Sequence, residues 1–111
     1  RLLTRDDRPD AVFCVTDLIA CGFMDEARHR FSLRIPEDLC IVGYDNIPQA
    51  GWSSYNLTTF AQPVEQFARD AAQWLIGTER QDHTLQLHTE QEQTCRIYQA
   101  EVKWRSSVRG G

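Results

Sequence analysis

Two short apolar runs constrain the fold more than any other feature of the sequence. Ala11–Val15 and Leu39–Tyr44 are apolar almost without interruption, a pattern typical of strands that are buried on both faces of a parallel sheet. Between them, apolar residues recur at helical spacing over Leu18–Phe31. Two parallel strands joined by a helix form a right-handed βαβ unit. The sequence therefore predicts an α/β fold with a parallel sheet.

The second half of the chain adds further elements to this sheet. Leu57–Phe60 predicts a short strand, and Pro63 is suited to the first turn of a helix that runs to Ile76, with Gly77 as its C-terminal cap. Residues 78–94 are polar and predict a loop that includes at most a short edge strand. Ile97–Trp104 has one apolar and one polar face, which is typical of an edge strand.

Composition excludes several classes of function. The chain has 16 acidic and 12 basic residues, a net charge of −4, so it lacks the basic face that phosphate binding requires. None of its four cysteines forms a Cys-x-x-Cys pair, and the histidines are not spaced as zinc ligands. We expect buried thiols that act as small hydrophobic groups, no metal site and no cofactor. No run approaches the roughly 18 apolar residues that a membrane span needs.

Polar side chains follow both predicted strands where a ligand could bind. In open α/β sheets ligands bind beyond the carboxyl ends of the strands, and Asp17 and Asp45 follow the two apolar runs there. An ionised Asp only accepts hydrogen bonds, so it suits hydroxyl groups or a basic nitrogen. Each residue has a structural alternative: helix capping is favoured for Asp17, a turn is equally good for Asp45, and Thr16 could simply end a strand.

Motifs for catalysis are absent from the sequence. It has no Gly-rich phosphate loop, no nucleophile elbow and no Ser-His-Asp set at a recognisable spacing, so we expect a binding protein rather than an enzyme. Cys21 and Gly22 place small groups on the first helix, and Gly22 costs about 1 kcal/mol of helix stability relative to Ala. We interpret this surface, together with Met24 and Trp52, as a contact between subunits.

Four segments give the chain a family resemblance. They are Arg8–Gly22, which includes the strand end at Thr16-Asp17; Ile35–Pro48, which includes Ile-Val-Gly-Tyr-Asp at 41–45; Leu57–Pro63, which reads Leu-Thr-Thr-x-x-Gln-Pro; and Ile97–Ser107, which ends in Arg-x-Ser. In this order they resemble the lactose/galactose-repressor (LacI/GalR) family of bacterial transcriptional regulators. The resemblance covers nearly the whole chain.

The resemblance implies a periplasmic-binding-protein-like effector domain with two lobes, of which this chain forms mainly the C-terminal lobe. Residues 1–60 would belong to the second lobe, 61–80 to a crossover helix of the first lobe, 81–95 to a polar loop, and 96–107 to a last strand that returns to the second lobe. Because the chain begins without Met and enters a strand almost directly, we expect it to be a piece of a longer protein. The family's DNA-binding helix-turn-helix is not part of it.

The resemblance also implies roles for individual residues. Asp45 matches the family's effector-binding Asp, Thr16 replaces a contacting Asn, and Gln62 and Val64 fall at positions that line the cleft; together with Asp17 they form the predicted effector site. Val64 stands where some relatives have an aromatic residue. Dimer contacts are predicted in the first helix and the following loop, at Leu18, Cys21, Gly22, Met24, Asp25, Trp52 and Ser53.

The predicted function is that of a cytoplasmic sensor in a homodimeric regulator. A small metabolite, a sugar or a related compound, would bind between the lobes, shift the population of lobe arrangements and thereby control operator DNA through the absent module. Two alternatives stay open: a periplasmic sugar-binding protein of an uptake system, and an α/β enzyme that uses Asp17 and Asp45. The sequence identifies neither the effector nor the direction of its effect.

Overall fold

The computed structural model describes residues 1–80 and 96–110. The chain divides into two compact units. Unit 1 consists of Arg1–Gln62 and Glu101–Gly111, and unit 2 consists of Pro63–Ala100. The prediction that these parts belong to two lobes of a larger domain stays a prediction, and each unit is described by itself.

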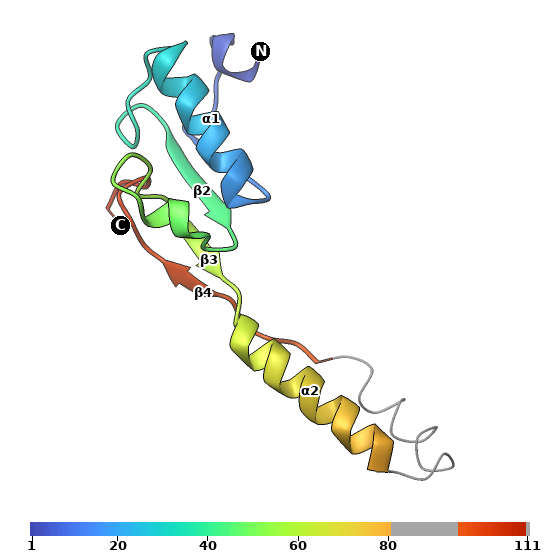
Figure 1. The fold of residues 1–111 in the computed structure, drawn as a ribbon. Coiled ribbons are helices and arrows are strands. Elements are labelled where there is room, and N and C mark those ends of the chain that lie inside the picture. Colours follow the sequence, from blue (N-terminus) through green and yellow to red (C-terminus); the bar gives the residue numbers. More distant parts are fainter. Residues whose placement is uncertain (81–95, 111) are drawn as a thin grey trace. The chain divides into compact units, whose positions relative to one another are not determined.

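Unit 1 is built on a sheet of four strands in the order β1-β2-β3-β4 (Figure 1). The strands are β1 (Ala11–Phe13), β2 (Cys40–Tyr44), β3 (Thr58–Ala61) and β4 (Glu101–Lys103). The first three run parallel, and β4 pairs antiparallel with β3 at the edge. The predicted parallel α/β sheet is therefore confirmed. A short 3-10 turn, η1 (Leu2–Thr4), precedes it.

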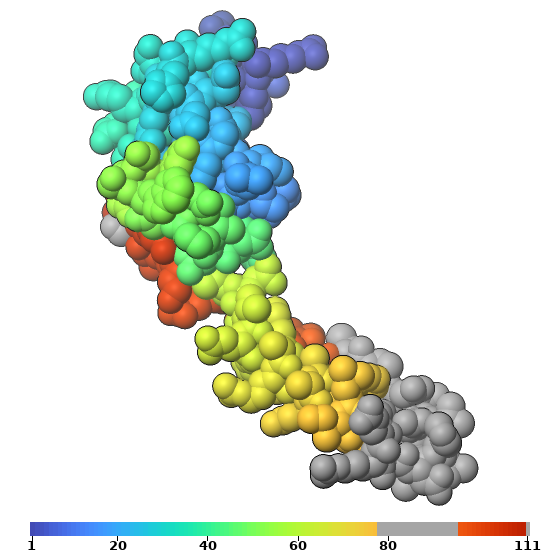
Figure 2. All heavy atoms as spheres, viewed as in Figure 1, coloured from blue at the N-terminus to red at the C-terminus, as the bar shows by residue number. Residues whose placement is uncertain are grey.

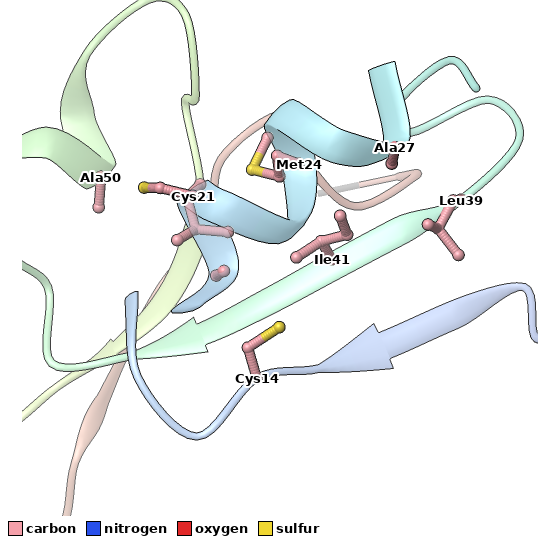
Figure 3. Packing of buried hydrophobic residues seen from close by; sticks show 9 residues of the cluster. Cys14, Cys21, Met24, Ala27, Leu39, Ile41 and Ala50 are labelled. Atoms are coloured by element: carbon pink, nitrogen blue, oxygen red, sulfur yellow. The ribbon is translucent and has the colours of Figure 1, made fainter. Parts of the chain in front are cut away.

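Helix α1 (Asp17–His29) covers one face of this sheet and forms the core with it. Its buried stripe includes Ala20, Met24 and Ala27, which pack against Leu39 and Ile41 of the β2 region (Figure 3). Full burial of a side chain as large as Met or Ile stabilises a fold by about 1.5–3 kcal/mol. The helical spacing of the apolar residues in the sequence thus becomes the inner face of α1.

The start of α1 corrects one sequence-based interpretation. Asp17 is the first residue of the helix, and the N-cap is Thr16, whose Oγ1 accepts a hydrogen bond from the backbone N–H of Ile19 at 3.3 Å. The favoured interpretation of Asp17 as a cap is therefore wrong. Thr caps a helix nearly as well as Asp, which leaves the Asp17 carboxylate available for other partners. The helix ends at His29, two residues before the predicted Phe31.

The segment after β2 folds back against α1. It contains a 3-10 turn, η2 (Pro48–Gly51), whose Ala50 joins the core. Tyr55 donates its hydroxyl hydrogen bond to Asp25 of α1 at 3.0 Å, and Arg28 of α1 donates to the carbonyl oxygen of Ser54. In Figure 2 the blue atoms of α1 lie against the green atoms of this segment. The loop that the sequence predicts between the second apolar run and Leu57 is therefore packed against α1.

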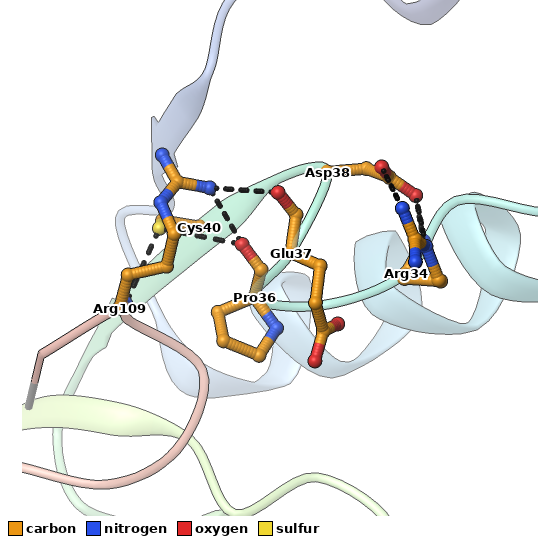
Figure 4. A network of polar contacts seen from close by, with 6 residues as sticks. All are labelled: Arg34, Pro36, Glu37, Asp38, Cys40 and Arg109. Carbon is orange, nitrogen blue, oxygen red and sulfur yellow. Dashed lines mark hydrogen bonds and ion pairs between the residues drawn. The ribbon is translucent and has the colours of Figure 1, made fainter.

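The residues after β4 join β2 and β3 by hydrogen bonds. Ser107 is buried; its hydroxyl donates to the carbonyl oxygen of Ile41 at 2.6 Å and accepts from the backbone N–H of Thr58 at 2.8 Å. The guanidinium of Arg109 donates to the carbonyl oxygens of Pro36 and Glu37, just before β2 (Figure 4). Residues far apart in sequence therefore fix the start of the central strand.

Unit 2 contains helix α2 (Val64–Arg80), which continues through Gly77 instead of ending at Ile76 as predicted. Phe67 of α2 packs edge-on against Tyr98, with ring centroids 4.5 Å apart. The Tyr98 hydroxyl donates to Asp70 at 2.6 Å, and Arg96 forms an ion pair with the same carboxylate. The predicted polar loop at 81–95 lies outside the described residues.

Three of the four cysteines are described, and all three are buried free thiols: Cys14, Cys21 and Cys40. This confirms the prediction for them, and burial raises the pKa of the Cys14 and Cys21 thiols. Over residues 1–80 and 96–110, no cluster of side chains is suited to a metal ion. In the same residues, no helix has both the length and the apolar character needed to cross a bilayer.

Candidate functional site

The carboxyl ends of β2 and β3 bring two predicted site residues into contact. Asp45 directly follows β2, and Gln62 directly follows β3. Because the two strands are parallel neighbours, their ends meet at one edge, and the Gln62 side-chain amide donates to Asp45 Oδ1 at 2.8 Å. Asp45 is exposed, and its Oδ2 accepts no hydrogen bond from the described part of the chain. This exposed, acceptor-rich pair is the centre of the candidate site.

The backbone at Asp45 is in an unusual conformation. Asp45 has φ 124° and Asn46 has φ 57°, both in the region that favours glycine. Non-glycine residues in such conformations cost about 1–3 kcal/mol each, and they persist where the surrounding structure holds them. Strain of this kind clusters at ligand sites, so the contacts that hold Asp45 and Asn46 are part of the site.

One of these contacts comes from Asp17, which is fully buried at the start of α1. Its Oδ1 accepts the hydroxyl hydrogen of Thr59 at 2.5 Å, and its Oδ2 accepts the backbone N–H of Ile47 at 2.9 Å. The Thr59 hydroxyl oxygen in turn accepts the backbone N–H of Asn46 at 3.4 Å. Asp17 was predicted to face the ligand; both of its oxygens are instead engaged inside the protein, beneath the Asp45 loop.

Gly43 makes room for this buried carboxylate. A Cβ atom at position 43 would lie 2.2 Å from Asp17 Oδ1 and 3.0 Å from the Leu57 side chain. Both distances are shorter than ordinary van der Waals contact, and Asp17 is fully buried with both carboxylate oxygens hydrogen-bonded. The glycine of the Gly-Tyr-Asp motif therefore serves the close approach of Asp17 to β2.

Arg105 holds the same loop from another direction. Its guanidinium donates to Asn46 Oδ1 at 2.9 Å and to the carbonyl oxygen of Leu57 at 2.8 Å. The backbone of Arg105 is fixed by two hydrogen bonds with the Thr58 hydroxyl. Sequence analysis assigned no site role to Arg105 or Thr59. Their only signals were the Arg-x-Ser ending and a pair of polar residues inside a short strand.

Aromatic rings adjoin the Asp45–Gln62 pair. Tyr44 stacks on Phe60 with ring centroids 6.0 Å apart, and Phe60 meets the ring of Phe13 edge-on at 6.2 Å. Phe13 is 58% exposed. Small-molecule sites combine apolar and aromatic surface with a few polar groups. The ends of β1, β2 and β3 supply both kinds of surface.

The other two predicted effector residues are Thr16 and Val64. Thr16 is half-buried and caps α1 with its hydroxyl oxygen. Val64 is the first residue of α2 in unit 2 and is 63% exposed. No described contact joins either of them to Asp45, and their role in ligand binding stays a prediction.

The predicted dimer residues divide into two groups. Cys21 and Met24 belong to the core between α1 and the sheet, so the prediction that their side chains contact another subunit is wrong. The reason is the phase of the helix, which buries both side chains; Figure 3 shows Cys21 directed toward Ala50 of η2. The remaining residues are on or near the surface. Leu18 is 72% and Trp52 56% exposed, Gly22 and Ser53 are exposed, and Asp25 is half-buried against Tyr55.

Comparison with known proteins agrees with this architecture. The sequence profile of the periplasmic binding protein-like domain family matches residues 1–108. The HTH-type transcriptional repressor PurR of Vibrio cholerae is 40% identical over 76 residues, which cover 68% of this chain and 22% of that repressor. The chain thus spans about a quarter of the length of such relatives.

Solved structures give the same result. A protein from Actinobacillus succinogenes superposes with a TM-score of 0.78 at 27% identity, over 97% of this chain and 36% of that one. A LacI family regulator from Lactobacillus casei with bound sucrose superposes with a TM-score of 0.72 at 31% identity, over 96% and 37%; it is also known with bound glucose. The chain belongs to the periplasmic-binding-protein-like family, in the form that LacI/GalR-type regulators use as their effector domain.

Proposed function

We propose that this chain is the effector-sensing and dimerisation part of a bacterial LacI-type transcriptional regulator, and that it binds a small hydroxyl-rich metabolite such as a sugar. The observation that carries the proposal is the Asp45–Gln62 pair at the carboxyl ends of two parallel strands. Asp45 offers an acceptor oxygen to solvent, and Gln62 offers an amide that combines donor and acceptor. Hydroxyl groups match both.

The chemistry of the pair favours binding over catalysis. An ionised carboxylate held by an amide selects ligands with hydrogen-bond donors, and it rejects analogues that lack them. The Lactobacillus casei relative, which binds sucrose and glucose, supports a sugar as the class of ligand. The adjoining rings of Tyr44 and Phe60 would cover an apolar face of such a ligand.

In the proposed mechanism, ligand binding acts on DNA indirectly. The ligand favours one arrangement of the effector domain because its affinity for the two arrangements differs. A homodimer in the cytoplasm transmits this shift to DNA-binding modules outside this chain. The exposed residues Leu18, Gly22, Trp52 and Ser53 are the proposed subunit contact, with Asp25 at its margin.

A thermal-shift experiment on the full-length protein tests the ligand class. Glucose, sucrose and the purine base guanine are the probes, and a binding sugar raises the melting temperature by mass action, about 2.7 kcal/mol of stabilisation at 100 times its Kd. The Asp45→Asn variant should lose most of this shift, whereas Asp6→Asn, at another exposed position, should retain it. Equal shifts in both variants would contradict a ligand contact at Asp45.

A DNA-binding assay separates the regulator from the uptake protein. The full-length protein should retard a fragment that carries the upstream region of its own gene, and a probe that raises the melting temperature should change that retardation. A protein that binds sugar but no DNA would favour the periplasmic sugar-binding alternative. Turnover of the probe that is lost in Asp17→Asn and Asp45→Asn would instead favour the enzyme.

A further inference from the structure

We infer that the buried Asp17–Thr59 pair is the positioning element of the site: it fixes the loop that presents Asp45 and so sets ligand affinity without touching the ligand. The inference rests on the proposed function, because it assigns to Asp45 the role of ligand acceptor. It replaces the predicted direct contact between Asp17 and the effector.

The hydrogen bonds converge on the loop in a way that supports this role. The two backbone N–H groups that follow Asp45 both donate to the pair. The N–H of Asn46 donates to Thr59 Oγ1 at 3.4 Å, and the N–H of Ile47 donates to Asp17 Oδ2 at 2.9 Å. The pair is closed by the 2.5 Å hydrogen bond from the Thr59 hydroxyl to Asp17 Oδ1. The loop is therefore attached at the two residues that follow the ligand carboxylate.

The buried Asp17 carboxylate lies in the first turn of α1, where the helix dipole favours a negative charge. A fully buried carboxylate is costly unless it is paired and hydrogen-bonded, and no cation of the described residues lies within ion-pair distance of Asp17. An apolar side chain in its place would leave the Ile47 N–H and the Thr59 hydroxyl without this acceptor. The carboxylate provides two acceptor oxygens in fixed positions, one for the Thr59 hydroxyl and one for the backbone N–H of Ile47.

The backbone conformation of the Asp45 loop explains why it needs these two hydrogen bonds. Asp45 and Asn46 both have positive φ, so the loop relaxes unless it is held. The hydrogen bond from Gln62 reaches Asp45 Oδ1 at 2.8 Å in this conformation. Weakening the buried pair therefore disperses the Asp45 carboxylate over several orientations, and affinity falls by the fraction of molecules that lose the competent one.

Substitutions at Thr59 test the inference in the full-length protein. Thr59→Val removes the hydroxyl at constant size, and Thr59→Ser keeps it. Ser107→Ala is the matched control, because it deletes another buried hydroxyl that has two backbone partners and none in the Asp45 loop. Hydrogen exchange of the Asn46 and Ile47 amides is measured first, since it needs no ligand. Affinity for glucose and sucrose is measured second.

Thr59→Val should speed exchange of these two amides relative to β2 and lower probe affinity roughly 2- to 10-fold, the equivalent of one lost hydrogen bond. Thr59→Ser should restore both, and Ser107→Ala should lower global stability without either effect. The positioning role is wrong if the Asn46 and Ile47 amides of the Thr59→Val variant exchange hydrogen as slowly as in the wild type. It is also wrong if Ser107→Ala speeds exchange of the same two amides. If the loop loosens while Asp45→Asn leaves affinity unchanged, the positioning stands and the proposed ligand contact fails.

Discussion

The two units of the chain differ in how they are stabilised. Every fully buried side chain among the described residues belongs to unit 1, where α1 and the sheet enclose a core that includes Met24 and Ile41. In unit 2, the described residues contain none. There α2 is joined to the returning chain by a Phe67–Tyr98 ring contact and by the polar contacts of Asp70.

This difference shows where the candidate site gets its rigidity. Asp45 and Gln62 are attached to strands that are anchored in a core, so their relative positions are set by packing. Helix α2 presents exposed apolar side chains such as Val64 and Ile76, and its helical period predicts a buried face. Unit 1 therefore provides the scaffold of the candidate site, and the described part of α2 carries exposed apolar side chains.

The largest expected effect comes from the core of unit 1. Ile41→Ala should destabilise the 1–111 chain by about 2–5 kcal/mol, because it removes a fully buried side chain and leaves a cavity. Val64→Ala, at a mostly exposed position, should change stability by less than about 0.5 kcal/mol. Urea unfolding measures both. Equal losses would show that the contrast between the units does not hold.

Substitution of a glycine in unit 1 should give the next largest loss of stability. Gly43→Ala should cost about 1–3 kcal/mol, because the new methyl group would overlap Asp17. Gly51→Ala is the control: its Cβ would meet no atom closer than Arg105 at 4.0 Å. Thermal unfolding of the two variants compares them. A Gly43→Ala variant as stable as Gly51→Ala would mean that Asp17 can move, which would also weaken the positioning role inferred for it.

A pair of tyrosines offers a matched test of the two units. Tyr55 donates to Asp25 in unit 1, and Tyr98 donates to Asp70 in unit 2. Tyr98→Phe should increase hydrogen exchange along α2, because it removes the described hydrogen bond that joins the helix to the returning chain. Tyr55→Phe should change exchange along α1 less, because the core remains. The reverse order would indicate that α2 has stronger support than the contacts of unit 2 provide.

The smallest expected effect concerns an exposed ion pair in unit 1. Hydrogen bonds from Arg34 lower the pKa of the Asp38 carboxyl from 3.8 to about 2 (Figure 4). Because the folded pKa is the lower one, the pair contributes stability above pH 3.8 and loses it as the pH falls toward 2. Asp38→Asn should flatten this part of the stability profile slightly. A large change would show that surface pairs, and not the core, dominate unit 1.

Several features of the fold were predictable from the sequence because they depend on local pattern. The apolar runs at 11–15 and 39–44 predicted parallel strands, and the helical period between them predicted α1. Short-range pattern reports which faces are buried, and a buried strand pair joined by a helix has few alternative topologies. The position of Asp45 beyond a strand end follows from the same reasoning.

Other features depended on neighbours that are distant in sequence. No local signal places the Thr59 hydroxyl on Asp17, 42 positions away, or the Arg105 guanidinium on Asn46. Small side chains at Cys21 and Gly22 led to the prediction of a subunit contact, but the structure buries Cys21 and Met24 and exposes Gly22. The exact phase of α1 on the sheet decides which of these side chains point inward.

The α/β class, the parallel order of the first two strands and the family could all be inferred from the linear sequence, because they follow from periodicity and from ordered motifs. Which of the two acids is exposed and which is buried became clear only from contacts between distant segments. Asp17 and Asp45 have the same side chain and both follow a strand, but one lies beneath Gly43 and the other faces solvent. A carboxylate's role depends on its partners and its access to water, and both are set by contacts that the linear sequence does not display.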